Sequence, residues 1–135
     1  MTNLTDQERQ FLIDVANEAR RRAYAPYSNY AVGAALRTKT GRIFTGVNVE
    51  NAAYPTTMCA ERVAVFKAVS EGEREFDVIS VVTADGGSPC GGCRQVLAEF
   101  GVEIIVLMGN GDGHLVEETT VARLLPGAFT SKSLK

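Results

Sequence analysis

Three cysteines and one glutamate in this chain have the residue types and the spacing of a reactive metal site. Cys59 and Glu61 lie two residues apart, and Cys90 and Cys93 form a Cys-x-x-Cys pair further along the chain. Thiolates bind zinc well, and a zinc site with three protein ligands keeps its fourth position for a water molecule. A carboxylate beside that water can accept its proton and later return a proton to a substrate. The pattern therefore predicts a catalytic centre that holds one Zn²⁺ per chain, with Glu61 as the proton carrier.

Two other interpretations of the cysteines stay open on these residues alone. A Cys-x-x-Cys pair between a strand and a helix is also typical of thioredoxin-like redox proteins, although that function leaves Cys59 and Glu61 unexplained. A closed structural zinc site needs a fourth protein ligand. The one histidine of the chain, His114, follows a glycine-rich turn, where a solvated side chain is the more common outcome. In the favoured catalytic site, Arg62 and Arg94 are expected to offset the negative charge of the thiolates.

The cysteines are expected at the first turns of two helices that flank one sheet. Capping residues and apolar residues at helical spacing predict helices, and β-branched or continuous apolar runs predict strands. In chain order, the sequence predicts a helix from residue 5 that ends before residue 24, strands over 31–38 and 43–49, a helix over 59–70, a strand over 78–83, a helix over 90–100, strands over 102–108 and 114–119, and a short helix over 121–125. Strands that alternate with helices favour parallel pairing in the middle of the chain, with hairpins at the flanks. The expected fold class is α/β, a three-layer α/β/α sandwich with a mixed five-stranded sheet.

Length, charge and composition narrow the class of protein further. The chain has 135 residues, so a single domain over 1–135 is expected, and its formal net charge of −2 argues against a broad nucleic-acid surface. The basic cluster at 20–22 is interpreted as a solvated helix end. The polar start and the lack of a long apolar run predict neither a secretory signal nor a membrane span. An odd count of three cysteines then predicts a reduced, cytoplasmic protein rather than a disulfide framework.

Six segments of the chain resemble the small homotetrameric cytidine deaminases, and the likeness runs from residue 24 to residue 129. They are 24–28 (YAPYS), 32–36 (VGAAL), 46–52 (GVNVENA), 59–62 (CAER), 88–95 (SPCGGCRQ) and 124–129 (LLPGAF). The cysteine pattern is also the three-cysteine form of the zinc deaminase signature. The resemblance implies a cytidine deaminase-like fold. It also implies zinc-dependent hydrolysis of cytidine and 2′-deoxycytidine to uridine and 2′-deoxyuridine, with release of ammonia, as in pyrimidine salvage.

The resemblance also implies roles for the residues of the metal site. Cys59, Cys90 and Cys93 would bind the zinc ion, and Glu61 would shuttle protons between water and the pyrimidine. Arg62 would donate to the cysteine thiolates and so temper their charge. A non-catalytic zinc-binding protein or a redox module would lack this division of roles and would release no ammonia from cytidine.

Five more residues would bind the nucleoside according to the resemblance. Asn48 and Glu50 would hold the ribose 3′-hydroxyl, since an amide and a carboxylate can together donate to it and accept from it. Ala60 would lie beside the substrate, and Tyr30 would place its ring against the pyrimidine where many relatives carry phenylalanine. Phe129 would reach into a neighbouring subunit's site in a homotetramer. Within the same chemistry, blasticidin S is the alternative substrate, and Glu50 argues against it because a sugar without the 3′-hydroxyl would leave this carboxylate unpaired.

Overall fold

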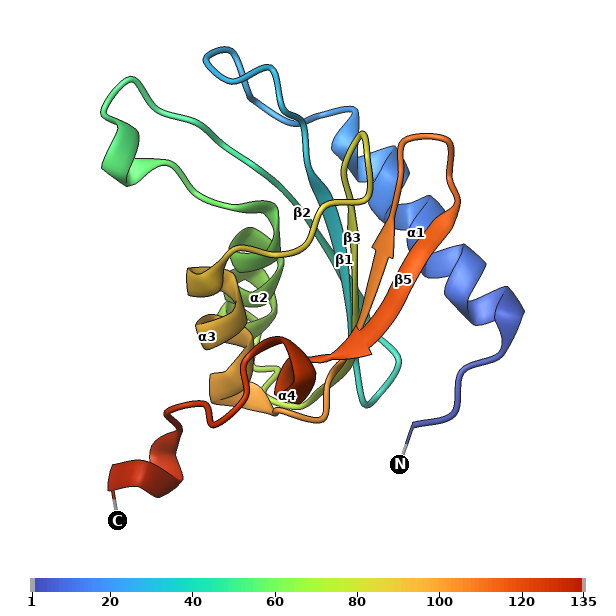
Figure 1. Cartoon of the computed structure of the whole chain (residues 1–135), viewed down its shortest axis with the longest axis vertical. Helices are drawn as coiled ribbons and strands as arrows, with labels where there is room; N and C mark the ends of the chain where they lie inside the picture. Colours follow the sequence, from blue (N-terminus) through green and yellow to red (C-terminus); the bar gives the residue numbers. More distant parts are fainter. Residues whose placement is uncertain (1, 135) are drawn as a thin grey trace.

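A computed structural model gives the structure of the chain over residues 2–134, and it shows a mixed sheet with helices on both faces (Figure 1). In chain order the elements are α1 (Asp6–Arg20), β1 (Gly33–Thr38), β2 (Ile43–Val47), η1 (Tyr54–Thr56), α2 (Ala60–Ser70), β3 (Phe76–Val82), α3 (Gly91–Phe100), β4 (Ile105–Gly109), β5 (Leu115–Thr120), α4 (Val121–Leu124) and η2 (Ser131–Leu134). Helix α1 covers one face of the sheet, and α2 and α3 cover the other. The predicted three-layer α/β/α fold is therefore confirmed. None of the helices within residues 2–134 is both long and apolar enough to cross a membrane.

The strands of the sheet lie in the order β2-β1-β3-β4-β5. Strands β3 and β4 are parallel and are joined through α3, whereas the pairs β1–β2, β1–β3 and β4–β5 are antiparallel. The central strand β3 is buried except at Asp77, as expected for a continuous apolar run that is covered on both faces. The loop from β3 to α3 leaves the carboxyl end of β3, the edge at which α/β sheets form their binding sites.

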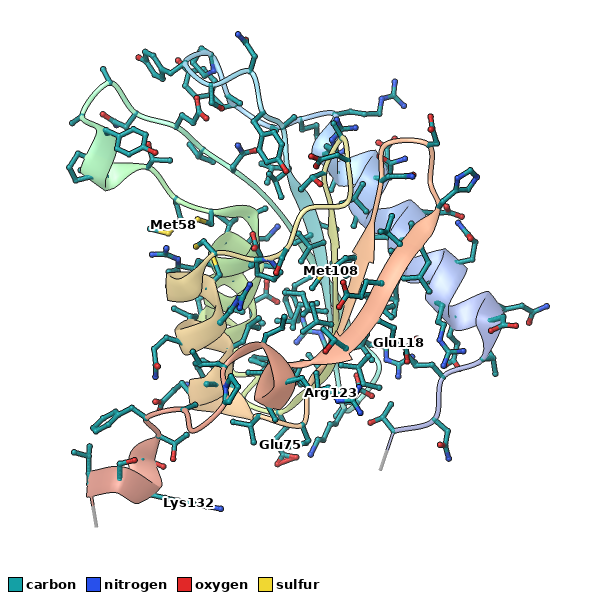
Figure 2. The ribbon with its side chains drawn as sticks, in the orientation of Figure 1. Met58, Glu75, Met108, Glu118, Arg123 and Lys132 are labelled. Carbon is teal, nitrogen blue, oxygen red and sulfur yellow. The ribbon has the colours of Figure 1, made fainter. Side chains whose placement is uncertain are left out.

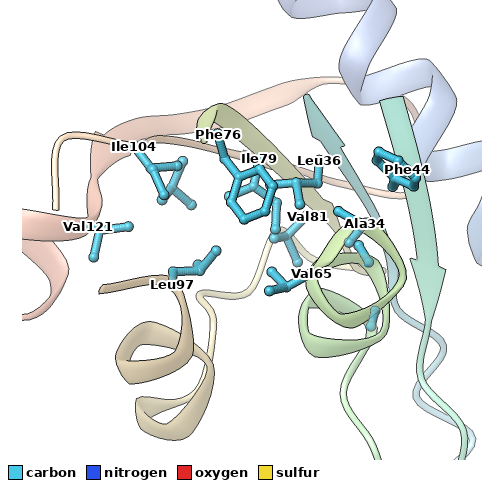
Figure 3. Close-up of a cluster of buried hydrophobic side chains, with 14 of the residues drawn as sticks. Ala34, Leu36, Phe44, Val65, Phe76, Ile79, Val81, Leu97, Ile104 and Val121 are labelled. Atoms are coloured by element: carbon cyan, nitrogen blue, oxygen red, sulfur yellow. The ribbon is translucent and has the colours of Figure 1, made fainter. Parts of the chain in front are cut away.

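Two groups of buried apolar side chains hold the three layers together. The larger group packs α2 and α3 against the sheet (Figure 3), and it includes Leu36, Val65, Ile79 and Leu97. The smaller group packs α1 against the other face, through residues that include Leu12 and Leu107. Burying one such side chain fully contributes about 1.5–3 kcal/mol. The first turns of α2 and α3 are therefore held at fixed positions relative to the sheet.

Glycines at two strand positions let the helices approach the sheet backbone closely. A Cβ atom at Gly46 in β2 would lie 2.2 Å from the carbonyl oxygen of Ala60 and 2.6 Å from the backbone nitrogen of Ala64, both in α2. A Cβ atom at Gly33 in β1 would lie 2.1 Å from the carbonyl oxygen of Ala16 in α1, on the opposite face. No side chain fits at either place, so Gly46 sets how closely the first turn of α2 packs on the sheet.

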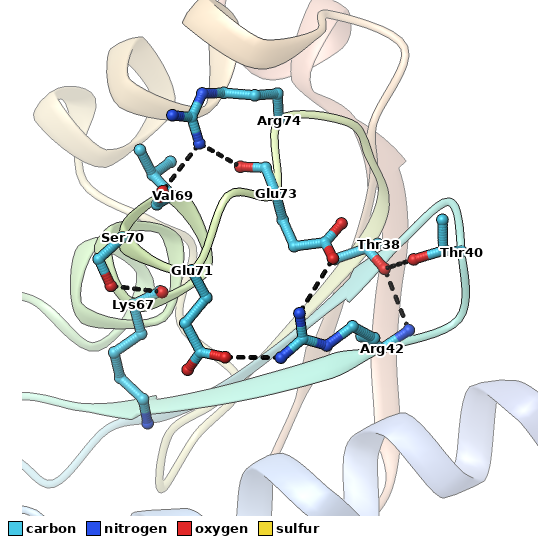
Figure 4. A network of polar contacts seen from close by, with 9 residues as sticks. All are labelled: Thr38, Thr40, Arg42, Lys67, Val69, Ser70, Glu71, Glu73 and Arg74. Carbon is cyan, nitrogen blue, oxygen red and sulfur yellow. Dashed lines mark hydrogen bonds and ion pairs between the residues drawn. The ribbon is translucent and has the colours of Figure 1, made fainter.

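A polar network fastens the other end of α2 to the β1–β2 hairpin (Figure 4). Arg42, in the hairpin, pairs with Glu71 at 2.6 Å and with Glu73 at 3.1 Å, just beyond the end of α2. Arg74 donates to the backbone carbonyl oxygens of Val69 and Glu73. An exposed ion pair contributes little alone, and networks contribute more. Helix α2 is thus tied to the hairpin at both of its ends.

The predicted start of the fourth strand is wrong by three residues. Strand β4 begins at Ile105 rather than at residue 102. The carbonyl oxygens of Val102 and Ile104 accept hydrogen bonds from the backbone N–H groups of Ala122 and Val121, at the start of α4. The apolar residues before β4 are therefore buried against α4, outside the strand ladder.

The second strand also differs from its prediction, because it ends at Val47 rather than at residue 49. Val49 instead exchanges two backbone hydrogen bonds of 2.9 Å with Met58. On its other side, the backbone of Tyr24 donates to Asn48 and accepts from Glu50. The chain after β2 consequently runs between the segment that follows α1 and the segment that enters α2.

Candidate active site

Helices α2 and α3 begin at the same end of the molecule, and the three cysteines lie at these helix starts. Cys59 immediately precedes α2, Cys90 immediately precedes α3, and Cys93 lies in the first turn of α3. Neither Cys59 nor Cys90 makes a side-chain capping hydrogen bond. The Sγ–Sγ distance is 3.9 Å between Cys59 and Cys90 and 3.3 Å between Cys90 and Cys93, and the three sulfurs all lie within 4.8 Å of one another. The fold thus brings together all three residues that the sequence predicted.

This triangle of sulfur atoms has the right size for zinc. Zn–S bonds of about 2.3 Å at tetrahedral angles separate two sulfurs by about 3.8 Å, close to the observed distances. A disulfide would bring two sulfurs to about 2.05 Å, and all three cysteines are free thiols. Within residues 2–134, no other group of three His, Cys, Asp or Glu side chains gathers in this way.

The charge of the three sulfurs also calls for a cation. A hydrogen bond with Cys93, reinforced by one with Cys90, lowers the pKa of Cys59 to about 5. The hydrogen bond with Cys59, together with burial, raises the pKa of Cys93 above its ordinary value. The protein alone therefore stabilises one thiolate in this group, and a divalent ion is needed before all three can ionise together. The donor set fits Zn²⁺ on this ground as well as on geometry.

Arg62 brings a positive charge to two of the three sulfurs. Its terminal nitrogen lies 3.7 Å from the sulfur of Cys59 and 3.8 Å from that of Cys90. The side chain reaches them from the first turn of α2, on the same helix as Glu61. The contact places the guanidinium group of Arg62 beside two of the three sulfurs.

Arg94, the other arginine expected to offset the charge of the thiolates, makes its hydrogen bonds elsewhere. Its guanidinium group donates to the carbonyl oxygens of Pro89 and Leu124, each at 2.8 Å, and to the hydroxyl oxygen of Ser88 at 2.7 Å. Because it follows Cys93 in the first turn of α3, its side chain points along the segment that enters the helix. Arg94 therefore fixes the backbone just before Cys90.

Glu61 is buried, with 5% of its surface exposed, and lines the same cavity as Cys59 and Cys90. Burial raises the pKa of its carboxyl above the ordinary value. A carboxyl with a raised pKa can return a proton as well as accept one, which is what general acid–base catalysis requires. In the open first turn of α2, the side chains of Cys59 and Glu61 both reach this cavity although they are only two positions apart.

The cavity beside these groups has a volume of about 310 Å³. Its walls come from four stretches of the chain, within 28–32, 48–61, 81–83 and 88–90. Met58, labelled in Figure 2, lies in this wall directly before Cys59. Among the described residues that line the cavity, Glu50 and Glu61 are acidic and none is lysine or arginine. Larger hollows of about 420 and 900 Å³ lie toward the opposite end of the sheet and contain none of the three cysteines.

Asn48 and Glu50 both line this cavity, and both also hold the loop before β1. The Asn48 amide accepts from the backbone N–H of Val32 at 2.9 Å and donates to the carbonyl oxygen of Tyr30 at 2.8 Å. The Glu50 carboxylate accepts from the backbone N–H groups of residues 27 and 28 and from the hydroxyl group of Ser28. The Ser28 hydroxyl, together with these backbone groups, lowers the pKa of Glu50 below its ordinary value. Both side chains are therefore fixed at the cavity wall before a substrate arrives.

The remaining residues expected to bind substrate differ in their placement. Tyr30 lines the cavity and is 42% exposed. Ala60 is fully buried and is absent from the cavity wall. Phe129 is 60% exposed, and its carbonyl oxygen accepts from the Gln95 side chain on α3, outside the cavity. One chain therefore brings Tyr30 to the site but does not bring Phe129 there.

Two polar residues of the cavity wall, Thr83 and Ser88, were missed by sequence reasoning. Thr83 follows the last residue of β3 and is buried, and Ser88 precedes the Pro-Cys pair. Their place at the carboxyl end of a buried central strand was the available signal, because binding residues gather at that edge. By contrast, His114 is exposed in the β4–β5 connection, as expected for a solvated side chain, and is not part of the sulfur cluster. The structure therefore supplies no histidine as a fourth ligand.

Comparisons with known proteins agree with this geometry. A family model of the cytidine and deoxycytidylate deaminase zinc-binding region matches residues 6–109. A cytidine deaminase of Sporosarcina psychrophila is 52% identical over 126 residues, covering 91% of this chain and 92% of the relative. A crystal structure of cytidine deaminase from Burkholderia pseudomallei aligns with a TM-score of 0.85 at 46% identity, covering 93% of this chain and 100% of that one. A blasticidin-S deaminase of Bacillus cereus is 35% identical over 138 residues, covering 95% of this chain and 96% of the relative. The chain therefore belongs to the cytidine and deoxycytidylate deaminase family and contains its zinc-binding region.

Proposed function

We propose that this protein is a zinc-dependent hydrolase that converts cytidine and 2′-deoxycytidine, with water, to uridine and 2′-deoxyuridine and ammonia. The observation that carries the proposal is the cluster of three thiols beside the buried carboxyl of Glu61, with Cys59, Cys90 and Glu61 lining one cavity of about 310 Å³. The residues present fit zinc in number, spacing and charge. Cytidine deaminases that are about half identical to the chain over most of its length support the same activity.

The proposed mechanism assigns the proton transfers to Glu61. When bound to the three thiolates, zinc supplies Lewis acidity that lowers the pKa of a water molecule in the cavity. Glu61 accepts a proton from that water and donates it to N3 of the pyrimidine while the water oxygen attacks C4. Glu61 then takes the second proton of the attacking oxygen and delivers it to the amino group, which leaves as ammonia. Burial of Glu61 favours both directions of transfer, because it raises the pKa of the carboxyl.

The cavity wall favours a nucleoside over a nucleotide as the substrate. A 5′-phosphate needs cationic side chains or free backbone N–H groups, and the described residues of the wall include neither lysine nor arginine. Asn48 and Glu50 offer an amide and a carboxylate for the ribose 3′-hydroxyl, which cytidine and 2′-deoxycytidine share. Cytidine 5′-monophosphate and 3′-deoxycytidine should therefore both be poor substrates. Equal kcat/KM values for 3′-deoxycytidine and cytidine would show that these two side chains do not bind the sugar.

Blasticidin S is the second candidate substrate, since a blasticidin-S deaminase is among the relatives at 35% identity. Its sugar lacks the 3′-hydroxyl, so Glu50 would gain no partner from the substrate and would keep only its contacts with Tyr27 and Ser28. We therefore place it behind cytidine. A redox or structural zinc module, the remaining alternative, does not use the buried Glu61.

One assay tests the proposed function directly. Purified protein loaded with zinc is incubated with cytidine, and the fall in ultraviolet absorbance is followed together with the release of ammonia. Activity that is lost on chelation and restored by Zn²⁺ would support the proposal. Full activity after complete removal of zinc, or no ammonia from any cytosine nucleoside, would refute it.

We further propose a homotetramer with active sites at the subunit contacts, in a reducing cytoplasmic setting. Phe129 and Tyr54 are 60% and 82% exposed, so large apolar surfaces at the tail and beside the cavity are left without cover in one chain. Closed symmetry would let each chain supply the same cover to another. Light scattering should report about four chains, and Phe129→Ala should raise KM while zinc stays bound. A fully active monomer would contradict the assembly.

The proposed cytoplasmic location rests on the cysteines. Three thiols that must stay reduced to bind metal favour the cytoplasm.

A further inference from the structure

The hydroxyl group of Tyr30 makes a contact that links two loops across the cavity mouth. It donates to the Oδ1 atom of Asp85 at 3.2 Å, over a separation of 55 residues. The first loop, here called the Tyr30 loop, comprises residues 27–32 and leads into β1. The second, here called the Asp85 loop, comprises residues 83–88 and leads from β3 to the Cys90 segment. Both loops contribute to the wall of the cavity.

The backbone of the Tyr30 loop is held by several hydrogen bonds, whereas the Tyr30 side chain is held, among the described residues, only by its bond to Asp85. The side chains of Asn48 and Glu50 fix the backbone of the loop. Asn29 adopts a positive φ of 58°, and the Tyr30 backbone N–H donates to Ser28 Oγ at 3.0 Å, so the chain turns sharply before Tyr30. These contacts leave the ring of a half-exposed tyrosine free to rotate about its side-chain bonds.

The Asp85 loop is organised to receive the Tyr30 hydroxyl. Thr83 is buried, and its hydroxyl oxygen accepts from the backbone N–H groups of Gly86 and Gly87 at 2.9 and 2.6 Å. The same hydroxyl group donates to Asp85 Oδ1 at 3.2 Å, which sets the position of that carboxylate. A Cβ atom at Gly87 would lie 2.7 Å from the Tyr30 hydroxyl oxygen, so this backbone leaves just enough space for the tyrosine tip.

We propose that Asp85 is a positioning residue for substrate binding, which holds the Tyr30 ring as a fixed wall of the nucleoside cavity. The inference rests on the proposed function, since it takes a cytosine nucleoside as the ligand. In this proposal, the Tyr30 hydroxyl group fixes the orientation of its own ring and makes no contact with the substrate. A ring that is already in place loses less conformational freedom when a planar base binds beside it.

The contact should act on binding and leave the zinc site unchanged. Arg94 independently fixes the Ser88–Pro89 backbone before Cys90, and α3 fixes Cys93. Losing the Tyr30–Asp85 bond should therefore raise KM without removing metal or lowering kcat. A single hydrogen bond to an exposed carboxylate predicts an increase in KM of about 5-fold, which is about 0.95 kcal/mol at 1.36 kcal/mol per tenfold change.

A double-mutant cycle on the zinc-loaded protein tests the proposal. Tyr30→Phe removes only the hydroxyl group, and Asp85→Ala removes the carboxylate that accepts from both Tyr30 and Thr83. Each should raise KM for cytidine about 5-fold, with kcat within about 2-fold and one zinc per chain retained. The double variant should show no further increase, because both changes remove the same bond. Asp85→Asn should restore KM to near the parental value, since its amide oxygen can still accept from Tyr30.

Two matched controls separate the contact from general effects. Tyr24→Phe removes an exposed hydroxyl group that has no hydrogen-bond partner among the described residues, and Asp112→Ala removes an exposed carboxylate from the β4–β5 connection. Neither should change KM. An unchanged KM in Tyr30→Phe, or increases that multiply to about 25-fold in the double variant, would overturn the proposal. If the parent released no ammonia from cytidine, the proposed function itself would fail, which is a different outcome from an active parent with a silent Tyr30→Phe.

Discussion

Gly46→Ala tests whether the distance between α2 and the sheet sets the positions of the reactive groups at the first turn of α2. The added Cβ atom would lie 2.2 Å from the Ala60 carbonyl oxygen, whereas ordinary contacts begin at 3.4 Å, so backbone must move by about 1.2 Å. Ala60 lies between Cys59 and Glu61, and the polar network at the far end of α2 resists a shift of the whole helix. The displacement should therefore fall on the first turn.

The expected loss of activity follows from that displacement. Overpacking of this kind costs about 1–3 kcal/mol of unfolding free energy. A misplacement of about 1 Å can reduce a reaction rate about 100-fold. We expect kcat/KM per folded molecule to fall about 100-fold in Gly46→Ala, together with weaker zinc binding. Folded protein is counted by circular dichroism, zinc is titrated with a chelator of known affinity, and deamination of cytidine is followed by absorbance.

Gly33→Ala is the matched control because it creates the same clash on the opposite face of the sheet. Its Cβ atom would lie 2.1 Å from the Ala16 carbonyl oxygen and 2.7 Å from the Arg20 backbone nitrogen, both in α1. It should lower the free energy of unfolding by a similar amount and leave the activity of the folded fraction within a few-fold of the parent. Equal losses of kcat/KM in the two variants would refute the argument, because α1 carries none of the reactive groups.

Three further predictions concern the reactive groups and the Tyr30 loop. Glu61→Gln should lower kcat by about 10²- to 10⁴-fold while elemental analysis still finds zinc, and near-parental turnover would remove Glu61 from its assigned role. Cys90→Ala should abolish activity and reduce the bound zinc in elemental analysis, whereas full metal occupancy would show that Cys90 is not a ligand. Hydrogen bonds from Ser28 and the adjacent backbone lower the pKa of Glu50 below 4.5, so its contribution to stability is present above that pH and is lost as the pH falls through the lowered pKa. Between about pH 3 and about pH 6, the melting temperature of the parent should therefore fall as the pH is lowered, and this part of the fall should be missing in Glu50→Gln. Identical pH profiles of the melting temperature in the parent and in Glu50→Gln would contradict the prediction.

The order and type of the elements could be predicted because their signals are local. The Thr5–Glu8 capping box is present as predicted, with Thr5 Oγ1 accepting from the Glu8 backbone at 3.0 Å. The continuous apolar run of β3 correctly predicted a strand that is buried on both faces. Strand ends were harder to predict. Val102 and Ile104 are apolar and pack with residues of α4, and composition does not distinguish that burial from burial in a sheet.

The metal site could also be predicted from the sequence. Cys59 and Glu61 lie two positions apart at one helix start, Cys90 and Cys93 lie at another, and few protein sites other than a zinc centre use such a set. Their types and spacing predicted a catalytic zinc centre, and two helices that begin at the same end of the sheet bring all three sulfurs within 4.8 Å. Arg94 shows the limit of that reasoning. It lies one residue after Cys93 in the sequence, but its side chain turns toward Ser88 and Pro89.

Only the tertiary structure decided how the cavity wall is held. The resemblance to cytidine deaminases implied Tyr30, Asn48 and Glu50 as substrate-binding residues, but nothing in their neighbourhoods along the chain showed that Asn48 and Glu50 fix the loop that carries Tyr30. The bond between Tyr30 and Asp85 spans 55 residues and depends on the register of β1 against β3 and on the path of the loop after Thr83. Helix caps and apolar periodicity are set by residues a few positions apart, so a sequence records them directly. A hydrogen bond between two loops exists only once the sheet has placed both loops at the same edge, and that is why the identity of the reactive groups was readable in advance while their support was not.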